Sequence, residues 1–169
     1  MPSIRIKSRA ARWHYGVYCY VPFDENIHNP HKKFIPKMIR SWVFANHKSV
    51  GRPISSSNDS IKEAVPRLVP WSWDQKVSLG RPGMLRIMVY NCSSRIAPVD
   101  MTNDASKFVE VTANLGTIPE SRINRERGTD GSEYYQVDFD IEVTCYRERI
   151  EFTLVYAGKR YDAVTKEYM

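Results

Sequence analysis

The stretch that decides the fold is YYQVDFDIEVTC (residues 134–145), which is followed after a short gap by IEFTLVY (residues 150–156). In both segments every second side chain is apolar, and most of the positions between carry acidic residues, glutamine or threonine. Such an alternation indicates strands with one face buried and the other in water. The polar connection at residues 146–149 is short enough for a hairpin. These residues therefore predict two antiparallel strands with an apolar face and an acidic face.

Five further segments have the composition of short strands, rich in β-branched and aromatic residues. Pro70 interrupts one of them, which predicts an edge strand or a bulge. The chain is therefore predicted to be all-β, an antiparallel β-sandwich of about seven strands with long loops, with a barrel as the alternative. The additional strands are expected at residues 15–23, 41–45, 68–73, 84–92 and 109–115, one helical turn at 61–65, and long loops at 95–107 and 116–132.

The length of 169 residues fits one domain with a single core. We expect residues 13–169 to form this domain and residues 1–12 to be a flexible basic linker or arm. Charge is distributed unevenly, because residues 1–52 hold ten Lys or Arg and two acidic residues, whereas residues 53–169 hold fifteen and seventeen. A basic leading segment of this kind is typical of an arm that binds an anion or an acidic neighbour.

Three widely spaced cysteines, Cys19, Cys92 and Cys145, indicate buried free thiols in a reducing compartment rather than a disulfide framework. The longest apolar runs are far too short to span a membrane, and no signal peptide is recognisable. These features predict a cytoplasmic protein without a membrane partner. A transit peptide in the basic N-terminus is the alternative.

Sequence signatures of catalysis are missing, since the chain has no phosphate-binding loop, nucleophile elbow, dinucleotide fingerprint or metal-protease helix. His28 and His31, with His14 and Cys19 nearby, have the residue types of a zinc site. Their spacing is generic, so solvated loop histidines are the preferred interpretation. We therefore expect no metal, no cofactor and no enzymatic activity.

The acidic face of the predicted hairpin offers a second chemical possibility. Asp138, Asp140 and Glu142 share this face, and two carboxylates on one face could in principle act as an acid and a base. A solvated acidic face is preferred, because nothing in the sequence distinguishes one carboxylate from the others. The basic residues expected to balance it are Arg147, Arg149 and Lys159.

An ordered set of stretches resembles divergent, mostly fungal, members of the seventy-kilodalton heat-shock chaperone family. SRAARWHYGV (residues 8–17) is similar to the junction after the actin-like ATPase domain, and WVFANHKSV (residues 42–50) to a following strand and turn. GTIP (residues 116–119), EYYQVDFDIEV (residues 133–143) and the segment at 150–161 are similar to later runs of that branch. The resemblance covers nearly the whole chain in order.

This resemblance implies a β-sandwich that, in the family, follows an ATPase domain and a linker and binds extended apolar peptides. The chain departs from the family because it has a basic segment in place of the acidic and apolar linker, no ATPase domain, and too few residues after Tyr161 for a helical lid. Any peptide binding should then be fast, weak and independent of nucleotide. A longer gene product that begins upstream of Met1 is an alternative.

The expected function is non-enzymatic, chaperone-like binding of extended apolar polypeptide by main-chain pairing and side-chain pockets. One alternative is a structural domain that docks on an actin-like ATPase domain through its basic arm. Binding of nucleic acid or an anionic surface by the same arm is a weaker alternative. The candidate peptide-binding residues are Trp42, Phe44, Trp71, Trp73 and Met88, and the candidate residues of the arm are Arg5, Lys7, Arg9 and Arg12.

Overall fold

The structure of the chain is a computed structural model. It describes residues 8–10, 13–22, 26, 33–35, 38–44, 60–93 and 105–168. Side chains are described at residues 13–17, 26, 63–93 and 105–168.

The described part of the chain consists of strands, turns and two short 3-10 helices. The strands are β1 (Ser8–Ala10), β2 (His14–Pro22), β3 (Lys33–Ile35), β4 (Met38–Phe44), β5 (Ser60–Lys62), β6 (Arg67–Lys76), β7 (Met84–Cys92), β8 (Ala105–Asn114), β9 (Asn124–Arg127), β10 (Glu133–Cys145), β11 (Arg149–Tyr156), β12 (Lys159–Arg160) and β13 (Val164–Glu167). The 3-10 helices are η2 (Val77–Leu79) and η3 (Glu120–Arg122).

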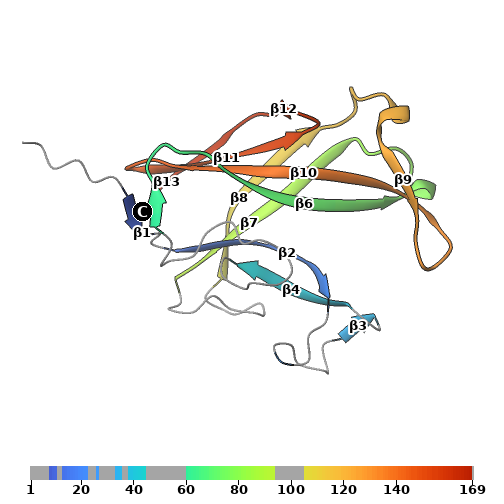
Figure 1. Cartoon of the computed structure of the whole chain (residues 1–169), viewed down its shortest axis with the longest axis horizontal. Coiled ribbons are helices and arrows are strands. Elements are labelled where there is room, and N and C mark those ends of the chain that lie inside the picture. The colour runs from blue at the N-terminus through green and yellow to red at the C-terminus, as the bar shows by residue number, and fades with distance from the viewer. Residues whose placement is uncertain are drawn as a thin grey trace, which may run out of the picture.

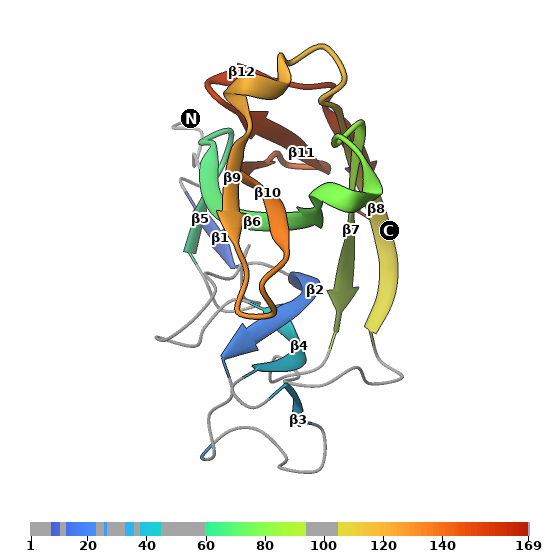
Figure 2. The ribbon, with the colours of Figure 1, turned by 90° about the vertical axis from the view of Figure 1, so that its right-hand side faces the viewer.

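Antiparallel pairing joins these strands into three sheets (Figure 1). The six-stranded sheet has the order β12-β11-β10-β6. β13 and β12 pair with different parts of the same edge of β11. β9 and β11 likewise pair with different parts of the same edge of β10. The five-stranded sheet has the order β3-β4-β2-β7-β8, and β1 with β5 forms a separate two-stranded ribbon. Figure 2 shows β7 and β8 along one flank of the six-stranded sheet, where β8 contacts β11 and β13.

The predicted all-β sandwich is confirmed. Its decisive hairpin consists of β10 and β11, in which Asp140 lies opposite Val155 and Cys145 opposite Ile150. All seven expected strands are present, as β2, β4, β6, β7, β8, β10 and β11, and β7 has the predicted bounds. β6 contains Pro70 and pairs with β10 on one side, whereas no strand among the described residues pairs with its other side, so it is the expected edge strand.

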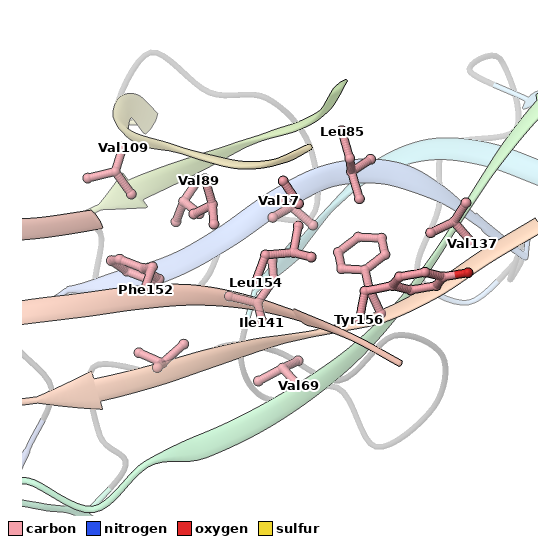
Figure 3. Packing of buried hydrophobic residues seen from close by; sticks show 14 of the residues in the cluster. Val17, Val69, Leu85, Val89, Val109, Val137, Ile141, Phe152, Leu154 and Tyr156 are labelled. Carbon is pink, nitrogen blue, oxygen red and sulfur yellow. The ribbon is translucent and has the colours of Figure 1, made fainter. Parts of the chain in front are cut away.

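The hydrophobic core lies between the two large sheets. Figure 3 shows Val17 and Val89 of the five-stranded sheet facing Phe152 and Leu154 of the six-stranded sheet, and each of these residues is at most 5% exposed. Burial of this apolar surface, at roughly 25 cal/mol per Å², is the main favourable contribution to folding. The alternation of apolar and polar residues in the sequence therefore gives each sheet one apolar face, and the apolar faces of the two sheets are buried against each other.

An aromatic cluster ties the two sheets together. The ring of Tyr15 in β2 lies 5.2 Å from that of Phe108 in β8 and 6.1 Å from that of Phe152 in β11, measured between centroids. Phe108 and Phe152 are also 6.1 Å apart, in an edge-to-face arrangement. Such pairs add about 0.5–1.5 kcal/mol to the effect of burial alone. The cluster therefore fixes the position of one sheet on the other.

Several segments predicted as loops or as a helical turn are strands. β8 begins at Ala105, β9 lies within the expected loop at residues 116–132, and the expected helical turn at residues 61–65 is instead β5 followed by a turn. All four residues of β9 are exposed and three of them are charged, so no alternation marks this strand. β5 pairs with β1, which is about fifty residues away in the sequence, so its conformation depends on a non-local contact.

Part of the predicted N-terminal arm has a defined pairing. Ser8–Ala10 forms β1, in which Arg9 lies opposite Ile61 of β5. Residues 1–7 and 11–12 lie outside the described residues. The division into an arm and a sandwich domain remains a prediction.

We expect Phe152→Ala to lower the free energy of unfolding by about 3–5 kcal/mol, because it removes a fully buried ring from the contact between the sheets. The measurement is urea unfolding followed by circular dichroism. Leu79→Ala is the control, since Leu79 is 74% exposed, and its effect should stay within about 0.5 kcal/mol. Equal effects of the two substitutions would contradict the assigned core.

Candidate functional site

The candidate site is the open edge of β6, by which we mean the side of Arg67–Lys76 that faces away from β10. β6 pairs with β10 over ten residue pairs, from Lys76 opposite Tyr134 to Arg67 opposite Val143. Within the described ranges no strand pairs with the open edge. A strand in this position has backbone N–H and C=O groups that are available to another chain.

The position of Pro70 shows which backbone groups face the open edge. Proline has no N–H group, so within a paired strand its nitrogen is tolerated where it points away from the partner. Pro70 lies opposite Asp140 of β10, so its nitrogen points to the open edge. Because N–H groups alternate in direction along an antiparallel strand, those of Ser72 and Asp74 point the same way. Trp71–Lys76 is therefore a continuous template of six residues beyond the proline.

The two faces of β6 differ in chemistry. Trp71 and Trp73 lie opposite Phe139 and Val137 of β10, and both indoles pack half-buried against the core. The indole Nε1 of Trp71 is buried without a hydrogen-bond partner in the described part of the chain. Ser72, opposite Asp138, is on the other face, which is turned away from the core. A side chain beside β6 would thus meet aromatic rings on one face and polar groups on the other.

An open depression of about 450 Å³ lies beside β6 on this outer face. Three adjacent strands form it: Pro70, Trp71 and Ser72 of β6; Asp138, Phe139 and Asp140 of β10; and Val155 of β11 with the turn residues Ala157 and Gly158. The small side chain of Ser72 separates the open edge from Asp138. The depression therefore reaches from the open edge towards two carboxylates.

The carboxylates near β6 have no basic partner in the part of the chain that the structure describes. Burial raises the pKa of Asp74 above its ordinary value, and the neighbouring charges of Asp138 and Glu126 raise it further. Among the described residues, no basic group forms an ion pair with Asp74, Asp138 or Asp140. Counting the described residues alone, the outer face beside the open edge is a negative region without paired cations.

Glu142, on the same face of β10, is in a different environment. Arg160 of β12 donates two hydrogen bonds to its carboxylate, from Nη2 at 2.6 Å and from Nε at 3.2 Å, and Glu142 is 8% exposed. The expected balance of this face by Arg147, Arg149 and Lys159 does not take the form of ion pairs in the described part of the chain. Arg149 instead lies over the ring of Tyr146 and Lys159 over that of Tyr161.

Polar contacts hold the far end of β6 and the adjoining β9–β10 hairpin. Lys76 Nζ donates a hydrogen bond of 3.0 Å to Asp130, which also accepts hydrogen bonds from Tyr134 OH and the Ser132 backbone N–H. The Ser132 N–H, Lys76 and Tyr134 together hold the pKa of Asp130 well below its ordinary value. Lys76 is therefore already engaged at the end of the template.

A second polar network supports β9 from the side of η3. Tyr135 OH donates to Glu120 at 2.6 Å, and Arg125 forms a salt bridge with the same carboxylate. Hydrogen bonds from Tyr135 and Arg125 lower the pKa of Glu120. Arg81 donates to the Gly116 carbonyl at 2.5 Å. The polar segment at residues 116–132 is thus tied to the sheet by specific contacts.

The five predicted peptide-binding residues are divided between the two large sheets. Trp71 and Trp73 lie on β6 and border the open edge, whereas Met88 is half-buried on β7, opposite Glu110. Trp42 and Phe44 belong to β4, opposite Tyr18 and Gly16 of β2, and their side chains lie outside the described residues. A site on β6 includes Trp71 and Trp73 together with Ser72 and Asp74, which the sequence analysis did not select.

The remaining predicted residues lie mostly outside the described ranges. Of the arm residues, Arg9 is in β1, while Arg5, Lys7 and Arg12 are not described. His28 and His31 are not described either, and His14 is buried in β2. Within the described ranges no three acidic, histidine or cysteine side chains form a group that could hold a metal ion, and no helix there is long and apolar enough to span a membrane.

Comparison of the chain with protein-family models, with curated proteins and with solved structures gives no match. The resemblance to the heat-shock chaperone family therefore remains a prediction.

We expect Asp74→Asn to raise the melting temperature at neutral pH by about 2 °C, because it removes a carboxylate whose charge is disfavoured by burial and like charges. The folded-state pKa of Asp74 lies above the ordinary value of 3.8, so this penalty is complete above the folded pKa and disappears as the pH falls below 3.8. Thermal unfolding at several pH values measures it. Glu151→Gln, on the same face, is the control. If Asp74→Asn still raised the melting temperature at the lowest pH, the assigned cause, the charge of Asp74, would be contradicted.

Proposed function

We propose that this protein is a non-enzymatic binding module that takes up an extended polypeptide segment along the open edge of β6. The observation that carries the proposal is a ten-residue strand that pairs with β10 on one side and with no described strand on the other (Figure 1). Addition of a strand to a free sheet edge is a common mode of peptide recognition. Main-chain hydrogen bonds supply affinity in this mode, and alternate side chains supply selectivity.

The aromatic face of β6 supports an apolar ligand. A bound strand would lie about 4.8 Å from β6, so that every second side chain sits beside Trp71 or Trp73. Both indoles are half-buried, so each retains exposed surface that an aliphatic side chain would cover. Such cross-strand contacts between aromatic and β-branched residues contribute about 0.2–1 kcal/mol each. The segment that fits this face carries an apolar residue at alternate positions.

Pro70 limits the length of pairing. It removes one donor from the open edge, so continuous main-chain hydrogen bonding is confined to Trp71–Lys76. A short segment that loses its conformational freedom on binding obtains little net free energy from so few contacts. The proposed binding is therefore weak and reversible, in keeping with a chaperone-like role.

The test is titration of isotopically labelled protein with a capped heptapeptide of alternating valine and glutamine. We expect amide shifts in the NMR spectrum at Ser72, Asp74 and Lys76, with a Kd of about 0.1–1 mM. Shifts concentrated in the five-stranded sheet, or none at millimolar peptide, would overturn the proposal.

A matched pair of variants locates the binding to the backbone of β6. Ser72→Pro removes the outward N–H at the centre of the template and should weaken peptide binding at least about tenfold, since pairing is interrupted as it is at Pro70. Ser72→Thr keeps that N–H and should change the Kd by less than about twofold. Amide spectra of the free variants show whether each remains folded. Equal affinity of the two variants would exclude pairing at the open edge.

A further inference from the structure

We infer that the segment bound at the open edge alternates apolar residues with lysine or arginine, and that its basic side chains reach across Ser72 to the carboxylates of the outer face. This inference rests on the proposed function and names its ligand class. It follows from the placement of three carboxylates that no described residue pairs with, from the depression beside β6 and from the small residue Ser72 between them.

The first step is the direction of the side chains. Successive residues of a bound strand point to opposite faces of the sheet, so those between the apolar positions point to the outer face. Their nearest neighbours there are Ser72 and Asp74 of β6, both of which are exposed. A basic side chain beside Asp74 would face a carboxylate directly across the strand pair, which is a favourable arrangement.

The second step is reach. Asp138 lies opposite Ser72 on β10, two strand spacings, about 10 Å, from a bound strand. Lysine and arginine can lay a long aliphatic stem on a surface and extend their charge beyond it. The depression is lined by Ser72, Asp138 and Asp140 together, so it offers space for such a stem between the open edge and the two carboxylates. A short side chain at this position of the ligand would leave the depression empty.

The third step is electrostatic. Asp74, Asp138 and Asp140 have no basic partner among the described residues, whereas Glu142 is already paired with Arg160. A cation brought by the ligand would compensate the charges that repel one another beside β6. The chain as a whole has a net charge of +6, so this negative region is a local property of the outer face.

Charge also argues for a partner rather than a second copy of the chain. Pairing of β6 with β6 of another molecule would extend one sheet and bring two uncompensated acidic faces together. Like charges in neighbouring strands are destabilising. A basic extended segment of a different polypeptide would avoid the repulsion between two acidic faces, because its cations would lie beside the carboxylates.

The experiment compares three capped heptapeptides in which valine alternates with lysine, glutamine or glutamate. At low salt we expect the lysine peptide to bind about tenfold more tightly than the glutamine peptide, since several partly exposed ion pairs form only with the lysine peptide. The glutamate peptide should bind more weakly than either. The preference for lysine should decline at high salt, where exposed charges are screened.

Paired substitutions assign the preference to specific carboxylates. In the variant Asp74→Asn with Asp138→Asn the lysine peptide should bind no more tightly than the glutamine peptide. Glu151→Gln, two strands from β6 on the same face, is the matched control and should keep the preference. A preference that survives the double substitution would overturn the inference.

The outcomes separate this inference from the proposed function. Equal binding of the lysine and glutamine peptides overturns the inference and leaves the proposed function in place, whereas binding of neither overturns both. Lysine-peptide binding that is unaffected by Ser72→Pro would show attraction to the surface without strand pairing and also overturns the inference. Sedimentation of the free protein as a dimer that Ser72→Pro dissociates would assign the open edge to a second copy.

Discussion

The pairing of β10 with β6 is the constraint on which the remaining structure depends. The ten pairs between these strands, together with the six pairs of β10 with β11, fix the side of the sheet that each residue of β6 takes. A slip of one residue would move every side chain of β6 to the opposite face. Burial of Val137, Phe139 and Ile141 opposes such a slip, because it would expose their partners on β6. The core therefore determines the chemistry of the open edge.

The sequence was sufficient to predict those strands in which apolar and polar residues alternate. β10 and β11 alternate over most of their length, and β7 was predicted at its observed bounds. β9, β12 and β13 were missed because they have four residues or fewer, and all but one of their residues are exposed. Their conformation depends on an adjoining long strand rather than on a buried face of their own. Local sequence patterns therefore predicted the long strands that form the core, but not the short exposed strands that pair with them.

The same distinction applies to the site. The aromatic content of residues 68–73 was enough to select Trp71 and Trp73, although it did not show that they would half-bury against the core. Ser72 and Asp74 have no distinguishing signal in the sequence. Their role follows from the absence of a described partner beyond β6 and from the carboxylates on β10. If the strand predicted at residues 68–73 had been extended to residue 76, Ser72 and Asp74 would have been placed on one face. The extension would not have shown that this strand has an open edge.

Glu142 and Asp138 illustrate what periodicity does not determine. They lie on the same face of the same strand, four residues apart. Glu142 is nearly buried because the hairpin from β11 to β12 brings Arg160 over it, whereas Asp138 is exposed and has no ion pair among the described residues. One carboxylate is thereby used to stabilise the fold, and the other remains available. The distinction depends on the turn at Ala157 and Gly158, where both residues have positive φ values and the chain reverses tightly.

An exposed edge strand has to be protected from pairing with copies of itself. Proline within the strand and charges beside it are two devices that sheets use for this purpose, and β6 has both, in Pro70 and Asp74. Neither device excludes every partner. Proline shortens the template to six residues, and negative charge opposes acidic or identical strands while it favours basic ones. The features that limit self-association of this sheet are thus the same features that would make its open edge selective.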